Sequence, residues 1–179
     1  MGASEENLEE QVRNVASSWA FRIAQNDKGL TQEEQIVLGL YEALNARDVR
    51  QVQAVIAEDL EWWFYGPPSQ RHLMRMLTGV DPLGTFAFVP LRVCTISSNK
   101  VLVEGKQDSS EVCWVHAWTL KDGSVTQLRE YFNTTLTVTD TSFNMVAYVP
   151  SQSHNCSIIW QSKLSDSIGK SFPGLVLAI

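Results

Sequence analysis

Apolar residues in the first third of the chain recur at the three- and four-residue spacing of amphipathic helices. Residues 4–26 carry one such stripe, and a second begins after Thr31, which has Glu34 at the capping-box position. This second stripe consists of Ile36, Val37, Leu40, Tyr41 and Leu44. A third, short helix is expected after Asp48, because aspartate readily accepts hydrogen bonds from the first amides of a helix. The pattern therefore predicts helices in succession at the start of the chain.

From residue 60 onward the pattern becomes that of β-strands, with one short helix expected at 69–78. Strand composition occurs at 60–65, 85–97 and 100–106, and twice within 110–135. Pro90 requires an edge strand or a bulge, because proline lacks the amide that a ladder hydrogen bond needs. Helices first and strands after predict an α+β fold, in which the helices cover one face of an antiparallel sheet.

Segment 110–135 has the pattern of a β-hairpin, because two alternating runs flank Asp122 and Gly123. One face of the first run places large rings around a histidine: Val112, Trp114, His116, Trp118 and Leu120. The loop contains either Asp122 and Gly123 alone, or these two with Lys121. In the longer loop Gly123 adopts the left-handed conformation of a bulge.

The loop length decides which side chains meet across the hairpin, because a one-residue slip exchanges the two faces. A two-residue loop places Arg129 opposite His116. A three-residue loop places Leu128 opposite His116 and brings Glu130 and Phe132 onto the same face. We favour the three-residue loop, because Leu128 and Phe132 then share the face of the tryptophans.

Composition and charge exclude several classes of function. The chain has 179 residues, of which 44% are hydrophobic and 19% charged, which is the balance of a globular protein. A net charge of −6 without a basic cluster argues against nucleic-acid binding. Neither the three cysteines nor the three histidines have the spacing of zinc ligands. No metal site and no cofactor are expected.

The two ends of the sequence indicate where in the cell the protein is expected and how its C-terminal residues are placed. The acidic, polar start does not resemble a secretory signal, and no apolar run reaches membrane-spanning length. We therefore expect a cytoplasmic protein without a membrane partner, small enough at 20.1 kDa to diffuse into the nucleus. The apolar residues 173–179 are expected to dock on the domain or on a partner subunit.

The order of these elements resembles the nuclear-transport-factor-2-like (NTF2-like) superfamily, which includes ketosteroid isomerases, SnoaL-type polyketide cyclases and limonene epoxide hydrolases. Tyr41–Pro67 and His116–Thr134 carry this resemblance. Further on, Ile159–Leu164 and Lys170–Ile179 are similar to the plant wound-induced protein family. Members of that family are induced by wounding or senescence, and the resemblance implies no established chemistry.

The resemblance implies a cone-shaped NTF2-like domain at 30–140. A helical extension at 1–29 would precede it, and a C-terminal extension at 141–179 would dock on it or on a partner subunit. It also implies a homodimer through the convex face of the sheet. The residues expected on that face are Cys113, Val115, Ala117, Arg129 and Tyr131.

Catalytic positions of the ketosteroid isomerase branch are only partly matched. The tyrosine of its helix corresponds to about Leu40, its general base to about Phe64, and its oxyanion-hole acid to about His116. Leucine and phenylalanine cannot transfer protons, so isomerase chemistry is not expected. His116 and Glu130 remain as a candidate catalytic pair, because their backbones would lie within about 7–8 Å across the hairpin.

We expect the cone to bind a small hydrophobic molecule without catalysing a reaction. Its predicted ligand-binding walls are Leu40, Leu44, Trp62, Phe64, Trp114, Trp118, Leu128 and Phe132. One alternative is a small enzyme of the cyclase, isomerase or hydrolase type that uses Glu130 and His116. The other is a protein-interaction module that acts through its dimer face and its C-terminal segment.

Overall fold

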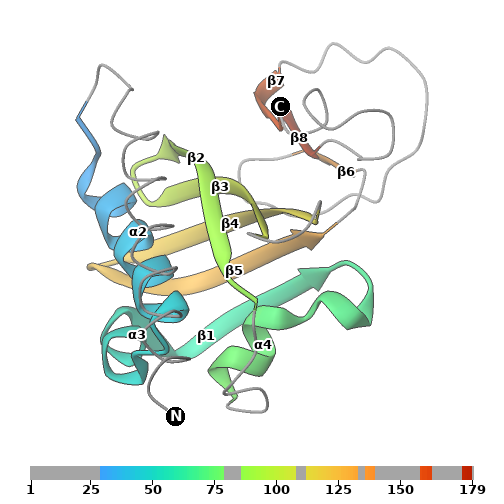
Figure 1. The fold of residues 1–179 in the computed structure, drawn as a ribbon. Coiled ribbons are helices and arrows are strands. Elements are labelled where there is room, and N and C mark those ends of the chain that lie inside the picture. The colour runs from blue at the N-terminus through green and yellow to red at the C-terminus, as the bar shows by residue number, and fades with distance from the viewer. Residues whose placement is uncertain are drawn as a thin grey trace.

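A computed structural model of the chain describes residues 29–78, 86–107, 112–132, 136–139, 158–162 and 175–178. Its helical segments are α2 (Gln32–Asn45), α3 (Val49–Val55), the 3₁₀ turn η1 (Pro68–Gln70) and α4 (His72–Leu77). The strands of the main sheet are β1 (Ile56–Tyr65), β2 (Phe88–Ser97), β3 (Lys100–Gln107), β4 (Cys113–Lys121) and β5 (Ser124–Phe132). A smaller sheet contains β6 (Leu136–Thr139), β7 (Ile158–Gln161) and β8 (Leu175–Ala178). Figure 1 shows α2 crossing one face of the curved main sheet.

Helix α2 begins as the sequence predicted. Thr31 Oγ1 accepts a hydrogen bond from the amide of Glu34 at 3.2 Å, and Glu34 Oε2 accepts one from the amide of Thr31 at 3.0 Å. Glu34 Oε1 also accepts from the amide of Thr95 on β2 at 2.9 Å. The capping box therefore both starts the helix and fixes it against the sheet. Asp48 caps α3 in the same way, through the amide of Gln51. The helix expected at 4–26, and with it the extension assigned to 1–29, lies outside the described residues.

The main sheet is mixed, whereas the sequence predicted an antiparallel one. Its strand order is β1-β5-β4-β3-β2, with antiparallel pairs from β2 to β5 and a parallel pair between β1 and β5. The chain leaves β1 through η1 and α4 and enters the sheet again at the far edge, so β5 returns to β1 without a tight turn. That path permits a parallel pair, which a two-residue hairpin cannot make. Pro90 lies on the edge strand β2, next to a register shift, as predicted.

The hairpin turn differs from the prediction. Lys121 pairs with Ser124, so the loop contains two residues and the favoured three-residue loop is wrong. Asp122 has φ 51° and Gly123 has φ 82°, both in the left-handed region. Positive φ at both central residues is the signature of a type I′ turn, whose twist matches that of the strands.

A bulge in β5 nevertheless brings the predicted side chains to the same face. The register shifts by one residue between Thr119 and Leu120, next to the turn. Beyond this shift, Glu130 pairs directly with His116, at the position where Leu128 was expected. The face of Glu130 is therefore confirmed, while its expected diagonal placement is wrong.

The side of the main sheet that faces α2, here called the concave face, holds the larger core. Its fully buried members include Val37, Leu40, Tyr41, Phe88, Val101, Val103, Trp118, Val125, Leu128 and Phe132. On the other side, here called the convex face, Leu102, Val115, Ala117 and Tyr131 form a second buried cluster. The homodimer expected through the convex face stays a prediction.

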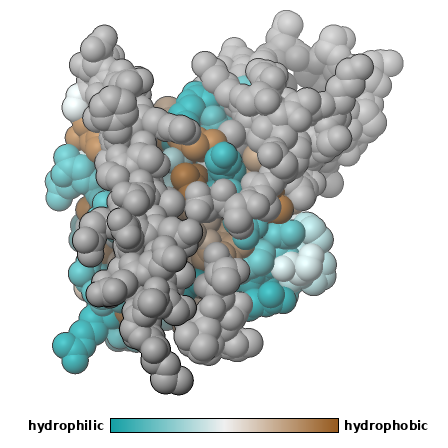
Figure 2. Space-filling view, in the orientation of Figure 1, coloured by the Kyte–Doolittle hydropathy of each residue, from teal (hydrophilic) through white to brown (hydrophobic). Residues whose placement is uncertain are grey.

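In the small sheet, β8 lies between β6 and β7, parallel to the first and antiparallel to the second. On the face that Figure 2 shows, the visible hydrophobic residues of the described part of the chain form small areas near hydrophilic ones. No helix in that part is both long enough and apolar enough to cross a bilayer.

Candidate functional site

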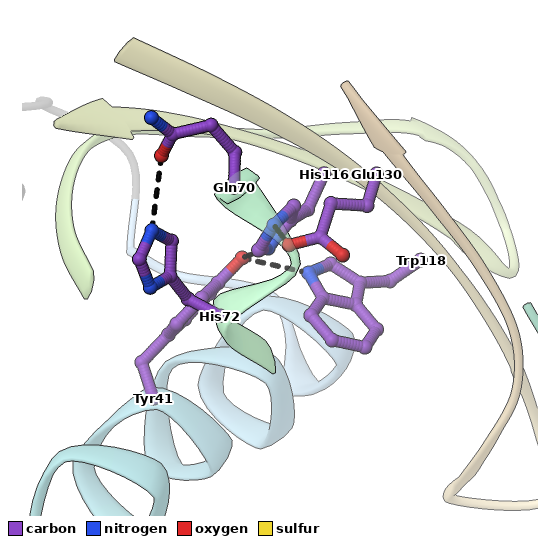
Figure 3. Close-up of polar contacts among 6 residues, drawn as sticks. All are labelled: Tyr41, Gln70, His72, His116, Trp118 and Glu130. Atoms are coloured by element: carbon purple, nitrogen blue, oxygen red, sulfur yellow. Dashed lines mark hydrogen bonds and ion pairs between the residues drawn. The ribbon is translucent and has the colours of Figure 1, made fainter. Parts of the chain in front are cut away.

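Tyr41 is the centre of a buried hydrogen-bonded network on the concave face. It belongs to the apolar stripe of α2 and points from the helix toward β4 (Figure 3). Its hydroxyl lies 2.7 Å from Nδ1 of His116 and 2.9 Å from Nε1 of Trp118. On its other side, His116 Nε2 lies 3.1 Å from Oε1 of Glu130. All four side chains are completely buried, with exposed fractions of 0%.

One tautomer of His116 gives every proton of this network an acceptor. An indole N–H can only donate, so the Tyr41 oxygen accepts from Trp118. The hydroxyl proton of Tyr41 is then donated to Nδ1 of His116. His116 consequently carries its own proton on Nε2 and donates it to the carboxylate of Glu130. This arrangement leaves no proton of Tyr41, His116 or Trp118 without an acceptor.

Aromatic rings enclose His116. Its ring centroid lies 4.6 Å from that of Trp114, 5.2 Å from Phe88 and 5.4 Å from Trp118. Tyr41 stacks on it at an interplanar angle of 11°. The imidazole is therefore held in one orientation by packing as well as by hydrogen bonds.

Burial raises the pKa of Tyr41 well above its ordinary value of 10.0. The hydrogen bond from Trp118 partly opposes this increase in pKa, and the nearby charge of Glu130 adds to it. Tyr131, on the convex face, also has its pKa raised by burial, an effect that the Arg129 charge partly opposes. Both tyrosines therefore stay protonated in the folded chain at pH values where an exposed tyrosine ionises.

Alkaline pH is expected to destabilise the protein through these tyrosines. In the unfolded chain they ionise near pH 10, whereas in the folded chain they resist ionisation, so the unfolded state binds fewer protons above this pH. Stability is full below pH 10 and falls above it, by about 1.4 kcal/mol per pH unit for each tyrosine. Urea denaturation at pH 8 and pH 11 measures the loss, which Tyr41→Phe should roughly halve.

Comparison with a matched variant, Tyr131→Phe, separates the stability that comes from the hydrogen bonds of the Tyr41 hydroxyl from the effect of its ionisation. At pH 8, Tyr41→Phe should cost about 1–3 kcal/mol, because Trp118 and His116 both lose a partner. Tyr131 Oη is buried and makes no hydrogen bond in the described part of the chain, so Tyr131→Phe should be neutral at pH 8. Both variants should reduce the alkaline loss. Equal costs of the two variants at pH 8 would contradict this account of the network.

Within the described residues, three buried polar atoms of the concave face have no hydrogen-bond partner. They are Oε2 of Glu130, Nε1 of Trp62 and Nε1 of Trp114. Glu130 lies between the two tryptophans in the sheet, because Trp62 and Trp114 pair with the residues two before and two after it on β5. The concave face thus retains one acceptor and two donors that the protein's own contacts do not use.

The structure brings the predicted site residues together as core. His116 and Glu130 are in direct contact. The predicted ligand-binding residues that are buried in the main core are Leu40, Leu44, Trp114, Trp118, Leu128 and Phe132. Trp62 and Phe64 are partly buried against the same core.

Tyr41 is the residue of the buried network that the sequence analysis did not predict. The tyrosine position of the isomerase branch was placed at Leu40, but the hydroxyl comes from the next residue, Tyr41. Both side chains are fully buried, because adjacent residues can share a broad helix stripe. The signal for Tyr41 was present in that stripe, as its one hydrogen-bonding side chain.

A pocket of about 710 Å³ lies between α2, α3, β1 and α4, and none of the four network residues is among its described lining residues. Its lining includes Ala43, Leu44, Arg47, Val49, Val52, Gln53, Ile56, Ala57, Glu58, Met76 and Leu77. Of the eight predicted ligand-binding residues, Leu44 alone appears among these described lining residues. Between α2 and the tryptophans of β4, Trp114 and Trp118, the space is instead occupied by Tyr41. Its ring centroid lies 5.4 Å from that of Trp114.

Arg47 provides a fixed positive charge at this pocket. It follows α2 in the left-handed conformation, with φ 58°. Its guanidinium donates to the carbonyl of Leu44 at 3.0 Å and to that of Phe86 at 3.2 Å. These bonds join the end of α2 to the start of the sheet and hold the arginine in place. Among the described residues, no cluster of histidine, cysteine and carboxylate side chains is suited to hold a metal ion.

Comparison with known proteins identifies a family. The family model described as "Wound-induced protein WI12" matches residues 74–179. Senescence associated gene 20 of Arabidopsis thaliana is 47% identical over 113 residues, which cover 59% of this chain and 100% of that protein. Wound-induced protein 1 of Solanum tuberosum is 41% identical over 107 residues, with 59% and 100% covered. An NTF2-like protein of unknown function from Burkholderia pseudomallei has a similar structure, with a TM-score of 0.45 and 20% identity, covering 57% of this chain and 92% of that one.

Proposed function

The chain belongs to the wound-induced protein WI12 family of plants, and from this premise we propose that it binds a small hydrophobic molecule without catalysis. The binding site is the pocket between α2, α3, β1 and α4. Its volume of about 710 Å³ carries the proposal, because ligand pockets for small molecules span roughly 300–1,000 Å³.

The lining suits an apolar molecule with a few polar groups. Eight of the described lining residues are aliphatic or methionine: Ala43, Leu44, Val49, Val52, Ile56, Ala57, Met76 and Leu77. Arg47, Gln53 and Glu58 supply the polar contacts. In this proposal these three side chains act as the polar anchors of the ligand.

Burial of the Tyr41–His116–Glu130 network supports binding rather than catalysis. A general acid or base must come within hydrogen-bond distance of a substrate atom. These three side chains are completely buried, and the hydrogen bonds of Tyr41 and His116 are all made within the protein. The network therefore holds α2 on the sheet, and in this proposal it has a structural role.

A fluorescent apolar probe tests this proposal. N-phenyl-1-naphthylamine, which is uncharged, should bind the wild-type chain and gain fluorescence. Met76→Trp places a larger side chain in the pocket lining and should weaken binding at least about tenfold. Met74→Trp is the matched control, because Met74 lies on the same helix but is exposed and outside the described lining.

Two outcomes would reject the binding site. If the wild-type chain gave no saturable fluorescence change, the proposal that it binds a small apolar molecule would be rejected. If the two tryptophan variants bound the probe equally well, the ligand would lie elsewhere. Thermal melts of both variants check that each remains folded.

A further inference from the structure

The convex face of the main sheet carries one buried carboxylate among apolar side chains. Glu104 on β3 is 2% exposed, and its neighbours on this face include the buried cluster of Leu102, Val115, Ala117 and Tyr131. Burial of a carboxylate is costly unless hydrogen bonds compensate it. A face of this kind is therefore selective for a partner that brings donors to Glu104.

Arg92 and Ser162 each donate to one oxygen of Glu104. Arg92 Nη1, from the adjacent strand β2, lies 3.3 Å from Oε1. Ser162 Oγ, directly after β7, lies 2.7 Å from Oε2. Ser162 is itself only 4% exposed, so the residue after β7 is seated in the surface of the main sheet. A short hydrogen bond to a charged oxygen is among the stronger ones in proteins.

Arg92 makes a second connection to the same segment. Its Nη1 also donates to the backbone carbonyl of Gln161 at 3.3 Å. Arg92 thus bridges Glu104 and the end of β7, and these residues with Ser162 form one clasp. β7 pairs in turn with β8 in the small sheet, so the clasp connects that sheet to the convex face.

We propose that the convex face is the docking surface for the chain's own residues Gln161 and Ser162, at the end of β7, recognised through Glu104, and that this docking keeps a second copy of the chain off the same face. The convex-face cluster is buried within a single chain, which means that the chain covers it by itself. The expected convex-face homodimer would need that surface to be uncovered. This inference does not depend on ligand binding.

Hydrogen exchange and light scattering on full-length variants test the clasp. Ser162→Ala removes the short bond to Glu104, and amides of β7 should then exchange about ten- to a hundredfold faster. Glu104→Gln keeps the shape but loses the charge, and should have a smaller effect in the same direction. The wild-type chain should be monomeric, and Ser162→Ala should form dimers as its concentration rises.

Two controls make the result specific. Ser97→Ala removes a serine whose hydroxyl bonds Asn99 at 3.2 Å in an exposed turn, and β7 exchange should stay unchanged. Amides of β4 report on the main sheet, and their exchange should stay slow in every variant. If Ser162→Ala also accelerates the exchange of β4 amides, Glu104→Gln distinguishes loss of docking, which accelerates β7 alone, from general unfolding, which accelerates both.

Two results would overturn the proposal. Unchanged β7 exchange in both Ser162→Ala and Glu104→Gln would show that the clasp does not hold the segment. A wild-type dimer that dissociates in Ser162→Ala would show that the segment docks on a second copy rather than on its own chain.

Discussion

Replacing His116 by leucine is expected to lower the free energy of unfolding by about 3–5 kcal/mol. The substitution leaves the Glu130 carboxylate buried without its histidine partner and deprives the Tyr41 hydroxyl of its acceptor. The main part of the cost is the desolvated carboxylate, because burying a charge without compensation costs far more than losing one neutral hydrogen bond. Urea denaturation at neutral pH measures the change.

His72→Leu is the matched control for this substitution. His72 lies on α4, where its Nε2 bonds Gln70 (Figure 3). Its ring stacks on Phe86. Because His72 is only partly buried, its loss should cost about 1 kcal/mol. A second substitution at the site, Glu130→Leu in the His116→Leu background, should recover part of the stability by removing the unpaired charge. Equal costs for the two histidine variants would show that the buried network contributes little to stability.

Replacing Gly105 by alanine is expected to cost about 3 kcal/mol, the upper end for overpacking a core. Gly105 on β3 pairs with Trp114, and the indole lies directly over it. An added Cβ would come within 2.3 Å of the Trp114 ring and within 2.3 Å of the carbonyl oxygen of Val89. The ring could move only at the expense of Tyr41 and Phe88, which pack against it, and the carbonyl belongs to the backbone.

Gly39→Ala is expected to change stability in the opposite direction to Gly105→Ala. Gly39 lies exposed within α2, and an added Cβ would meet nothing within 4 Å. Alanine lowers the entropic cost of forming a helix, so this variant should gain about 0.5–1 kcal/mol. Thermal melts of the two variants should therefore shift in opposite directions. A Gly105→Ala variant as stable as the wild type would mean that Trp114 has room to move.

Local signals in the sequence were sufficient to predict where helices begin and which strand lies at an edge. Thr31 with Glu34, and Asp48, fixed the starts of two helices, because capping depends on residues within one turn. Pro90 identified an edge strand, since its missing amide is a property of the residue itself. The alternation of polar and apolar residues likewise placed Glu130 on the face of His116.

Interactions between distant segments were not predictable in the same way. The bulge in β5 has no clear residue signal, so an incorrect loop length and a missed bulge cancelled in the prediction of the face. The bond between Tyr41 and His116 joins residues 75 positions apart and depends on how α2 rotates over the sheet. The pocket is formed by four elements, and its lining follows from their packing rather than from any one pattern. The clasp at Glu104 has the same origin.

The parallel pairing of β1 with β5 also has a consequence for the order in which the fold can form. The β4–β5 hairpin closes a two-residue loop, so its contacts are local and can form quickly. β1 is made before β2, β3 and β4, but its only partner in the main sheet is β5. During synthesis β1 therefore emerges with both edges unpaired and stays so until the hairpin is complete, which makes it the segment of the main sheet most open to chaperones in the nascent chain.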